Sequence, residues 1–184
     1  VYGVGELSKT ILDKISSYGE LLSSYIFYEI TRFNNLDSEY IDARKIIFTK
    51  KSKGNSLVID FDKTSKKLDV VLNKKNSSCL IFPGFIASSH DKKTTTLGRG
   101  GSDFSASILA NIVNAKKLDI WTDVSGMYTA NPKIVKQAKP ISELSYEEAM
   151  ELSYFGAKVI YPPTIQPLIA KNIPINIKNT FKPK

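Results

Sequence analysis

Short apolar segments typical of β-strands alternate along this chain with longer segments of helical periodicity, and this alternation constrains the fold more than any other feature. The strand-like segments lie at residues 45–49, 57–61, 79–82, 117–121 and 174–177. Helical patterns occupy the N-terminal third, residues 65–75, the stretch from 103 to 115 and residues 145–154, and the last of these opens with the spacing of a capping box at Ser145 and Glu148. The polar segment 88–93, between residues 85–86 and 94–97, predicts the tip of a hairpin. The alternation predicts one α/β domain with a largely parallel sheet over the 184 residues.

The N-terminal helical pattern carries one apolar stripe. Its members recur at spacings of three, four and seven, and they are Leu12, Ile15, Leu22, Ile26 and Ile30. This spacing predicts a long helix that buries the stripe and ends at the turn formed by Asn34 and Asn35. The opposite flank is small and polar and includes Glu20, for which a solvated surface position is the alternative to a functional role.

The charge balance is basic, with 26 Lys and Arg against 18 Asp and Glu and a net charge of +8. Such a balance raises nucleic acid as a partner. The lysines, however, form scattered pairs, without a block of five or six like charges and without interleaved aromatic residues. We therefore expect no nucleic-acid binding, and a mild positive field equally favours small anionic substrates such as phosphates and carboxylates.

Cysteine, histidine and long apolar runs are scarce. The single cysteine, Cys79, allows no internal disulfide, and its apolar neighbours predict a buried position. The single histidine, His90, weakens any scheme that needs several histidines. No apolar run reaches the roughly 18 residues of a membrane helix, and residues 1–30 lack the pattern of a signal peptide. We expect a cytoplasmic protein that binds no membrane.

Residues 98–103, with the sequence Gly-Arg-Gly-Gly-Ser-Asp, lead directly into a helical pattern. Glycines let the backbone approach a ligand closely, and the free amides at a helix N-terminus favour an anion. Arg99 adds a planar fork suited to a carboxylate or a phosphate. The alternative is an ordinary turn in which Ser102 or Asp103 caps the helix. The segment is neither a Walker A sequence nor a dinucleotide-binding fingerprint.

A second candidate site follows the strand-like segment at 117–121. Thr122 and Asp123 lie at its C-terminal end, where ligands bind in open α/β sheets. Tyr128 lies six residues beyond Thr122 and could flank a base or a ribose, whereas an ordinary turn with a surface aromatic is the alternative. Lys158 lies between small and apolar neighbours and either contacts a phosphate or extends its amine to solvent.

Several motifs taken together resemble the aspartate kinase branch of the amino acid kinase family. The matching stretches are residues 17–20, 83–86, 94–103, 120–128 and 148–159. Their order and spacing agree with the family, and the likeness spans most of residues 17–180. Residues 161–167 and 177–180 are most similar to the kinase half of bifunctional aspartate kinase/homoserine dehydrogenases.

The resemblance implies a three-layer α/β/α sandwich with a mainly parallel sheet. An N-terminal lobe, residues 1–97, would hold the amino acid, and a C-terminal lobe, residues 98–184, would hold the nucleotide. The implied reaction transfers the γ-phosphoryl group of ATP, with Mg²⁺, to the side-chain carboxylate of L-aspartate, the first step of lysine, threonine and methionine biosynthesis. Relatives typically form homo-oligomers, and a covalent continuation into ACT and homoserine dehydrogenase domains is also implied.

The resemblance also assigns residues to roles. The substrate-binding residues would be Glu20, Phe85, Arg99, Gly100, Gly101 and Ser102, with Glu20 on the ammonium group of aspartate and Arg99 with the loop amides on its carboxylates. The nucleotide-binding residues would be Thr122, Asp123, Tyr128, Lys133, Lys158 and Val159. Asp103 and Lys158 would be catalytic, Asp103 as the acidic residue that orients lysines near the transferred phosphoryl group. No residue is assigned as a metal ligand.

Two departures from the family pattern concern phosphate binding. The family opens with a strand carrying Lys-Phe-Gly-Gly, whereas this chain begins Val-Tyr-Gly-Val, so we expect a domain that is incomplete at its N-terminus. Lys133 replaces the more usual arginine and loses its forked contact. The alternatives are another amino acid kinase, acting on glutamate, acetylglutamate or a nucleotide, or a non-catalytic nucleotide-binding fragment. The combination of Glu20 and Arg99 favours a substrate that carries both an ammonium and a carboxylate group.

Overall fold

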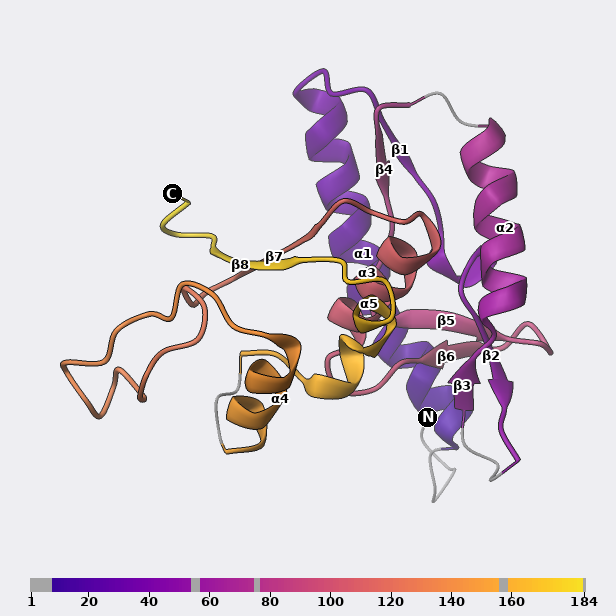
Figure 1. Ribbon diagram of the computed structural model, residues 1–184. Coiled ribbons are helices and arrows are strands. Elements are labelled where there is room, and N and C mark those ends of the chain that lie inside the picture. Colours follow the sequence, from indigo (N-terminus) through magenta and orange to yellow (C-terminus); the bar gives the residue numbers. More distant parts are fainter. Residues whose placement is uncertain (1–7, 54–56, 75–76, 156–158, 184) are drawn as a thin grey trace. The chain divides into compact units, whose positions relative to one another are not determined.

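The computed structural model describes residues 8–53, 57–74, 77–155 and 159–183 (Figure 1). The chain divides into two compact units, Val1–Ser105 and Ala106–Lys184. Both units combine helices with strands, and among the described residues three strand pairs are parallel and two are antiparallel. The predicted α/β class is therefore confirmed.

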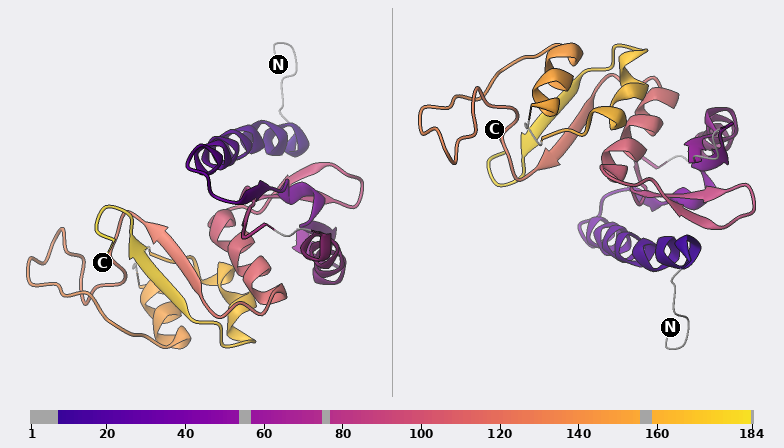
Figure 2. Two further views of the ribbon diagram at one scale, coloured as in Figure 1. Left: turned by 90° about the horizontal axis from the view of Figure 1, so that it is seen from above. Right: turned by 90° about the horizontal axis from the view of Figure 1, so that it is seen from below.

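Helices α1 (Lys9–Phe33) and α2 (Phe61–Lys74) flank the strands of the first unit on opposite sides (Figure 2). Helix α1 begins where the hydroxyl of Ser8 accepts a hydrogen bond from the amide of Ile11. It ends at Asn34, and Asn35 follows with a φ of 58°. Asparagine tolerates this left-handed conformation better than most residues, so the predicted end of the helix is confirmed.

The face of α1 that packs against the rest of the first unit is polar. Asp13, Ser17 and Thr31 are its buried residues. Thr31 shares a hydrogen bond with the hydroxyl of Ser38, with 2.7 Å between the two oxygens. Because neighbouring strands offer hydroxyl partners to Asp13 and Thr31, and Ser17 donates to the carbonyl of Lys14 within the helix, the small polar flank of the helix is the one that is buried.

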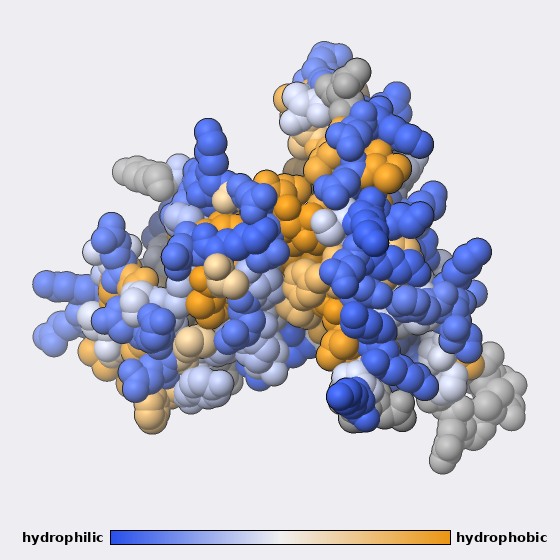
Figure 3. Space-filling view, turned by 45° about the vertical axis from the view of Figure 1, so that its right-hand side comes forward, coloured by the Kyte–Doolittle hydropathy of each residue, from blue (hydrophilic) through white to orange (hydrophobic). Residues whose placement is uncertain are grey.

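The prediction of a buried apolar stripe on α1 is therefore wrong. Leu12, Ile15, Leu22, Ile26 and Ile30 are each between 45% and 62% exposed. Hydrophobic side chains reach the surface in several patches on the face seen in Figure 3. The periodicity correctly predicts the helix, but the stripe has no covering element among the residues that the structure describes.

The strands of the first unit form two groups. The strands are β1 (Ser38–Tyr40), β2 (Phe48–Lys51), β3 (Leu57–Ile59), β4 (Cys79–Ile81), β5 (Ile86–Ser89) and β6 (Thr94–Thr96). Four of them form a sheet in the order β3-β2-β5-β6, with β2 and β5 parallel, and β1 pairs with β4 in parallel. The predicted hairpin of β5 and β6 is confirmed.

Several details of the first unit differ from expectation. The strand predicted at 57–61 ends at Ile59, and the helix predicted at 65–75 already begins at Phe61. The strand predicted at 45–49 begins only at Phe48, because a 3₁₀ turn, η1 (Ala43–Lys45), precedes it. Cys79 is exposed rather than buried, since it is the first residue of the short strand β4. The buried core of the sheet lies instead around Ile47, Ile86 and Ala87.

The second unit contains a parallel strand pair and several helices. Its elements are α3 (Gly101–Ile112), which begins in the first unit, β7 (Leu118–Thr122), α4 (Tyr146–Tyr154), η2 (Pro162–Thr164), α5 (Gln166–Ile169) and β8 (Ile175–Asn179). Strands β7 and β8 pair in parallel over all five residues of each. Ala110, Leu168 and Ile173 form a buried apolar cluster in this unit.

The predicted start of α4 is confirmed in detail. The amide of Glu148 donates to the hydroxyl of Ser145, and the amide of Ser145 donates to the carboxylate of Glu148 at 2.7 Å. This capping box satisfies two backbone donors that the first turn of a helix leaves without partners. None of the described helices combines the length and the hydropathy that crossing a membrane requires.

Candidate active site

Two loops of the first unit pack tightly against each other. Residues 83–85 lie between β4 and β5, and residues 97–100 connect β6 to α3, whose first residues, Gly101 and Ser102, continue the contact. A Cβ atom added to Gly84 would lie 3.0 Å from the Cα of Ser102, and one added to Gly101 would lie 2.6 Å from a ring carbon of Phe85. Larger side chains would separate the two segments, so both glycines are needed for the close approach.

Backbone hydrogen bonds join the same segments. The amide of Leu97 donates to the carbonyl of Phe85 at 2.8 Å, and the amide of Phe85 donates to the carbonyl of Gly101 at 3.3 Å. The hydroxyl of Ser105 accepts from the amide of Phe85 at 2.9 Å and donates to the carbonyl of Gly101 at 2.8 Å. Phe85 has a φ of 63°, an uncommon conformation for an aromatic residue that these contacts hold in place.

Glu20 joins this arrangement from α1. Its Oε1 accepts a hydrogen bond from the amide of Gly84 at 3.2 Å, and the side chain is half-buried. The alternative of a freely solvated glutamate is therefore not what the structure shows. Glu20, Phe85, Gly101 and Ser102, predicted as substrate-binding residues, lie in one contiguous group of contacts.

Arg99 occupies an exposed position in the glycine-rich loop. It lies between Gly98 and Gly100, whose φ angles are 74° and 66°. Both angles belong to the left-handed region that glycine adopts without steric cost. The amide of Gly101 donates to the carbonyl of Gly98 at 3.0 Å, so this loop closes on itself immediately before α3 begins.

Asp103 lies in the first turn of α3 and is half-buried. Burial raises the pKa of its carboxyl group above the ordinary value. A cation next to this carboxylate would lower its pKa again, because it favours the charged form.

The predicted nucleotide-binding residues lie in the second unit. Thr122 is the last residue of β7, and its hydroxyl donates to the carboxylate of Asp123 at 3.2 Å. The side-chain amide of Asn179, at the end of β8, donates to the carbonyl of Asp123 at 3.3 Å. The carboxyl ends of two parallel strands thus meet at the position where ligands bind in such sheets.

The remaining predicted residues of this set are less closely connected. Tyr128 forms an isolated bridge with Pro140, and Lys133 is exposed, with its amide donating to the side chain of Asn131 at 3.0 Å. Val159 is half-buried, whereas Lys158 lies outside the described residues.

Sequence reasoning missed two residues that order these loops. Ser105 holds both Phe85 and Gly101, and its only signal was a small residue one turn after the glycine-rich loop. Asn179 links β8 to the turn after β7, and no local pattern distinguishes it from a surface asparagine. Phe85 lies 20 residues from Ser105, and Asp123 lies 56 residues from Asn179, so neither contact is local in the sequence.

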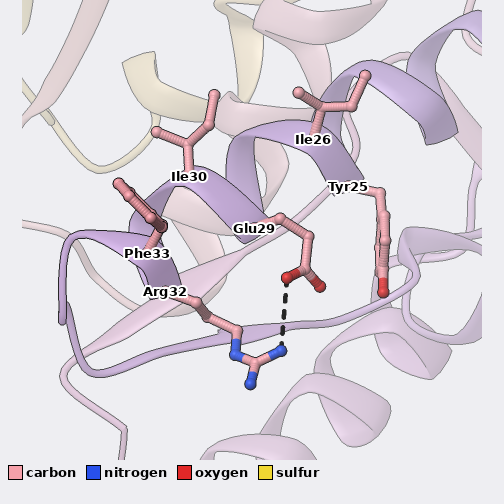
Figure 4. Close-up of a pocket in the computed structure, with 6 residues that line it drawn as sticks. All are labelled: Tyr25, Ile26, Glu29, Ile30, Arg32 and Phe33. Carbon is pink, nitrogen blue, oxygen red and sulfur yellow. Dashed lines mark hydrogen bonds and ion pairs between the residues drawn. The ribbon is translucent and has the colours of Figure 1, made fainter.

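An open pocket on α1 lies apart from these residues (Figure 4). Its lining residues are Tyr25, Ile26, Glu29, Ile30, Arg32 and Phe33. All six belong to one helix, and an ion pair of 3.4 Å joins Arg32 to Glu29. None of the predicted site residues lines this pocket, so it is part of the exposed face of α1 rather than of the candidate active site.

Comparison with known proteins gives one family. Residues 4–179 match the amino acid kinase family. The chain is 39% identical over 181 residues to the bifunctional aspartokinase/homoserine dehydrogenase 2 of Arabidopsis thaliana, covering 98% of this chain and 20% of that protein. It is 37% identical over 177 residues to the lysine-sensitive aspartokinase 3 of Escherichia coli, covering 96% of this chain and 39% of that protein.

Solved structures agree with these relatives. Escherichia coli aspartokinase III in complex with aspartate and ADP superposes with a TM-score of 0.87 at 36% identity, covering 98% of this chain and 40% of that one. A uridylate kinase from Archaeoglobus fulgidus, at 17% identity and a TM-score of 0.55, shares the fold alone. The chain therefore spans from 20% to 40% of the length of the aspartokinases named here.

Proposed function

The chain belongs to the amino acid kinase family, and we propose that it transfers the γ-phosphoryl group of ATP to the side-chain carboxylate of L-aspartate. The products would be ADP and 4-phospho-L-aspartate. The observation that carries this proposal is the group of contacts that joins Glu20, Gly84 and the glycine-rich loop around Arg99. The relatives named above, whose names are those of aspartokinases, support the same activity.

The amino-acid substrate would be held in the N-terminal lobe, about residues 1–97, together with the loop that follows it. Glu20 would bind the ammonium group of aspartate, because its carboxylate is held at the loop by the Gly84 amide. Arg99 would bind a carboxylate through its planar guanidinium group. Phe85, Gly100, Gly101 and Ser102 would complete the pocket, with backbone amides at the start of α3 favouring an anion.

The nucleotide would be held in the C-terminal lobe, about residues 98–184. Thr122 and Asp123 lie at the carboxyl end of β7, the position that favours a ligand in a parallel sheet. The other proposed nucleotide-binding residues are Tyr128, Lys133, Lys158 and Val159. The solved structure of Escherichia coli aspartokinase III is a complex with aspartate and ADP, and this similarity supports a nucleotide site in the fold.

The reaction joins two anions, so it depends on positioning and on charge neutralisation. An oxygen of the aspartate side chain attacks the γ-phosphorus while the bond from that phosphorus to the β-phosphate oxygen breaks, and ADP leaves with the bonding electrons. The attacking carboxylate is already ionised at neutral pH, so no histidine base is required. His90, the one histidine of the chain, instead bonds to Asp60 at 2.9 Å.

Charge neutralisation would come from several groups. Arg99, Lys158 and the first-turn amides of α3 are the fixed positive groups, and Asp103 would orient a lysine next to the transferred phosphoryl group. Among the described residues no three acidic, histidine or cysteine side chains gather to hold a metal by themselves. Mg²⁺ would therefore be held chiefly by the phosphates of ATP, where it neutralises the charge that develops during transfer.

A hydroxamate assay tests the proposal directly. Full-length protein is incubated with aspartate, ATP and Mg²⁺ in the presence of hydroxylamine, which traps an acyl phosphate as a hydroxamate that is then detected as its coloured complex with ferric iron. We expect product with aspartate and none when ATP is omitted. Product with glutamate or acetylglutamate in place of aspartate would indicate another member of the family. Phosphorylation of UMP forms no acyl phosphate, so it is followed separately by the release of ADP. Nucleotide binding without any product would indicate a non-catalytic module.

A further inference from the structure

Asp13 is a buried carboxylate outside the predicted site. It lies on α1, is 7% exposed, and precedes Glu20 by seven residues, which places the two carboxylates two turns apart on the same side of the helix. The hydroxyl of Thr96 donates to Oδ1 of Asp13 at 2.7 Å. The ammonium group of Lys9 donates to both carboxylate oxygens, at 2.8 and 3.0 Å.

The two partners of Asp13 differ in their surroundings. The side chain of Lys9 is 69% exposed, so water and salt screen its ion pair. Thr96 is the last residue of β6, and it pairs with Ile86 in the hairpin. The hydrogen bond from Thr96 therefore spans two elements that are 83 residues apart in sequence, and it is charge-assisted.

Thr96 immediately precedes the loop that carries Arg99. After it, Leu97 bonds to the carbonyl of Phe85, and the two left-handed glycines of the loop follow. Because glycine imposes little conformational preference of its own, the course of this loop depends on how its ends are anchored. The Asp13 contact anchors the end that leaves β6, and the start of α3 anchors the other end.

We propose that Asp13 is a positioning residue for the amino-acid substrate. Its carboxylate fixes Thr96, and through Thr96 it fixes the loop that presents Arg99, on the same helix that carries Glu20 to the Gly84 amide. Helix α1 thereby sets the position of the two groups that would bind the opposite charges of aspartate. This inference rests on the proposed function for its substrate, but the anchoring of the loop is testable without it.

Asp60 provides a matched control. It is also 7% exposed, and its carboxylate bonds to His90 at 2.9 Å and to the amide of Lys63 at 3.2 Å. These contacts cap α2 and the tip of the β5–β6 hairpin, and none of them involves the glycine-rich loop. Asp60→Asn therefore tests what the loss of an equally buried charge does by itself.

The experiment compares Asp13→Asn, Thr96→Val and Thr96→Ser with Asp60→Asn and Lys9→Met in the full-length protein. Hydrogen exchange is followed at Leu97, Gly101 and Phe104, whose amides all donate internal hydrogen bonds. KM is measured separately for aspartate and for ATP. We expect Asp13→Asn and Thr96→Val to speed exchange at these amides and to raise KM for aspartate, each about tenfold, with KM for ATP changed less than about twofold.

Thr96→Ser retains the hydroxyl, so its amide exchange rates and its KM for aspartate should match those of the unsubstituted protein. The same result is expected for Lys9→Met and Asp60→Asn. If Asp13→Asn does not fold, Thr96→Val, which keeps the shape of the side chain, decides alone. The inference is overturned if Thr96→Val leaves exchange and KM at the values of the Asp60→Asn control. If the unsubstituted protein phosphorylates no aspartate, the proposed function fails, and exchange still decides whether Asp13 anchors the loop.

Discussion

Glu20 and Gly84 are joined by a hydrogen bond of 3.2 Å although 64 residues separate them in the sequence. The bond holds the carboxylate of Glu20 next to the segment that packs on the glycine-rich loop. One acidic side chain of α1 is thereby fixed in orientation before any substrate binds. Groups that are fixed in advance lose little conformational entropy on binding, so Glu20 is well suited to select for an ammonium group.

Glu20→Gln should weaken aspartate binding and leave stability nearly unchanged. The glutamine oxygen still accepts a bond from the Gly84 amide, whereas the negative charge that would bind the ammonium group is lost. We expect KM for aspartate to rise about tenfold or more, with KM for ATP little changed. Steady-state kinetics and a thermal unfolding curve measure the two effects. An unchanged KM for aspartate would contradict the assignment of Glu20.

Arg99→Ala should raise KM for aspartate more than KM for ATP. The guanidinium group lies in a loop whose φ angles are set by glycines, so removing it changes the charge without disturbing a packed core. Arg99→Lys retains the charge but loses the planar fork of the guanidinium group. We expect its KM for aspartate to lie between that of the unsubstituted protein and that of Arg99→Ala. A larger rise in KM for ATP than in KM for aspartate would place Arg99 at the nucleotide instead.

Gly101→Ala should destabilise the protein. The added methyl group would lie 2.6 Å from a ring carbon of Phe85 and 3.2 Å from its Cα, so the two loops would have to separate. We expect a loss of about 1–3 kcal/mol in the free energy of unfolding, measured by denaturant titration.

Gly19→Ala is the matched control for this prediction. Gly19 lies inside α1 with nothing within 4 Å of an added Cβ. Alanine favours a helix interior over glycine by about 1 kcal/mol, so this variant should gain stability. Equal losses in the two variants would show that the contact with Phe85 is not the cause.

Asp103→Asn should increase stability at neutral pH while it abolishes phosphoryl transfer. Burial raises the pKa of Asp103 in the folded state, so the folded protein binds this proton more tightly than the unfolded chain does. The free energy of unfolding then falls as the pH rises from the pKa of an ordinary carboxyl group through the raised pKa of Asp103. Asparagine does not ionise, so Asp103→Asn avoids this loss of stability. The stabilities of the variant and the unsubstituted protein should therefore differ least in acid and more at neutral pH. Thermal unfolding across this pH range, together with the hydroxamate assay, measures both effects.

Local signals predicted much of the fold. Ser145 and Glu148 predicted the start of α4, and the polar segment between β5 and β6 predicted the hairpin, because caps and turns depend on residues close in sequence. The burial of α1 could not be predicted in this way. The periodicity of the helix identifies an apolar stripe, but which flank is covered depends on partners such as Thr96, which lies 83 residues from Asp13 in the sequence.

The candidate site likewise combines features that the sequence predicts with contacts that it does not predict. The glycine-rich loop and the end of β7 could be located from residue type and position. The contacts that give these residues their geometry join Glu20 to Gly84 and Ser105 to Phe85. Such pairings arise only when the chain folds, and no local pattern reveals them. Their roles in the reaction stay predictions until the variants above are measured.

The exposed stripe on α1 has a practical consequence for handling this protein. Leu22 and Ile26 are 62% and 58% exposed and lie outside the contacts of the candidate site. Apolar side chains gathered on one exposed helix promote precipitation when a fragment is produced at high concentration. Replacing these two residues with glutamate or lysine should keep residues 8–183 in solution for crystallisation trials and spectroscopy, while the helix itself and its polar flank retain their sequence.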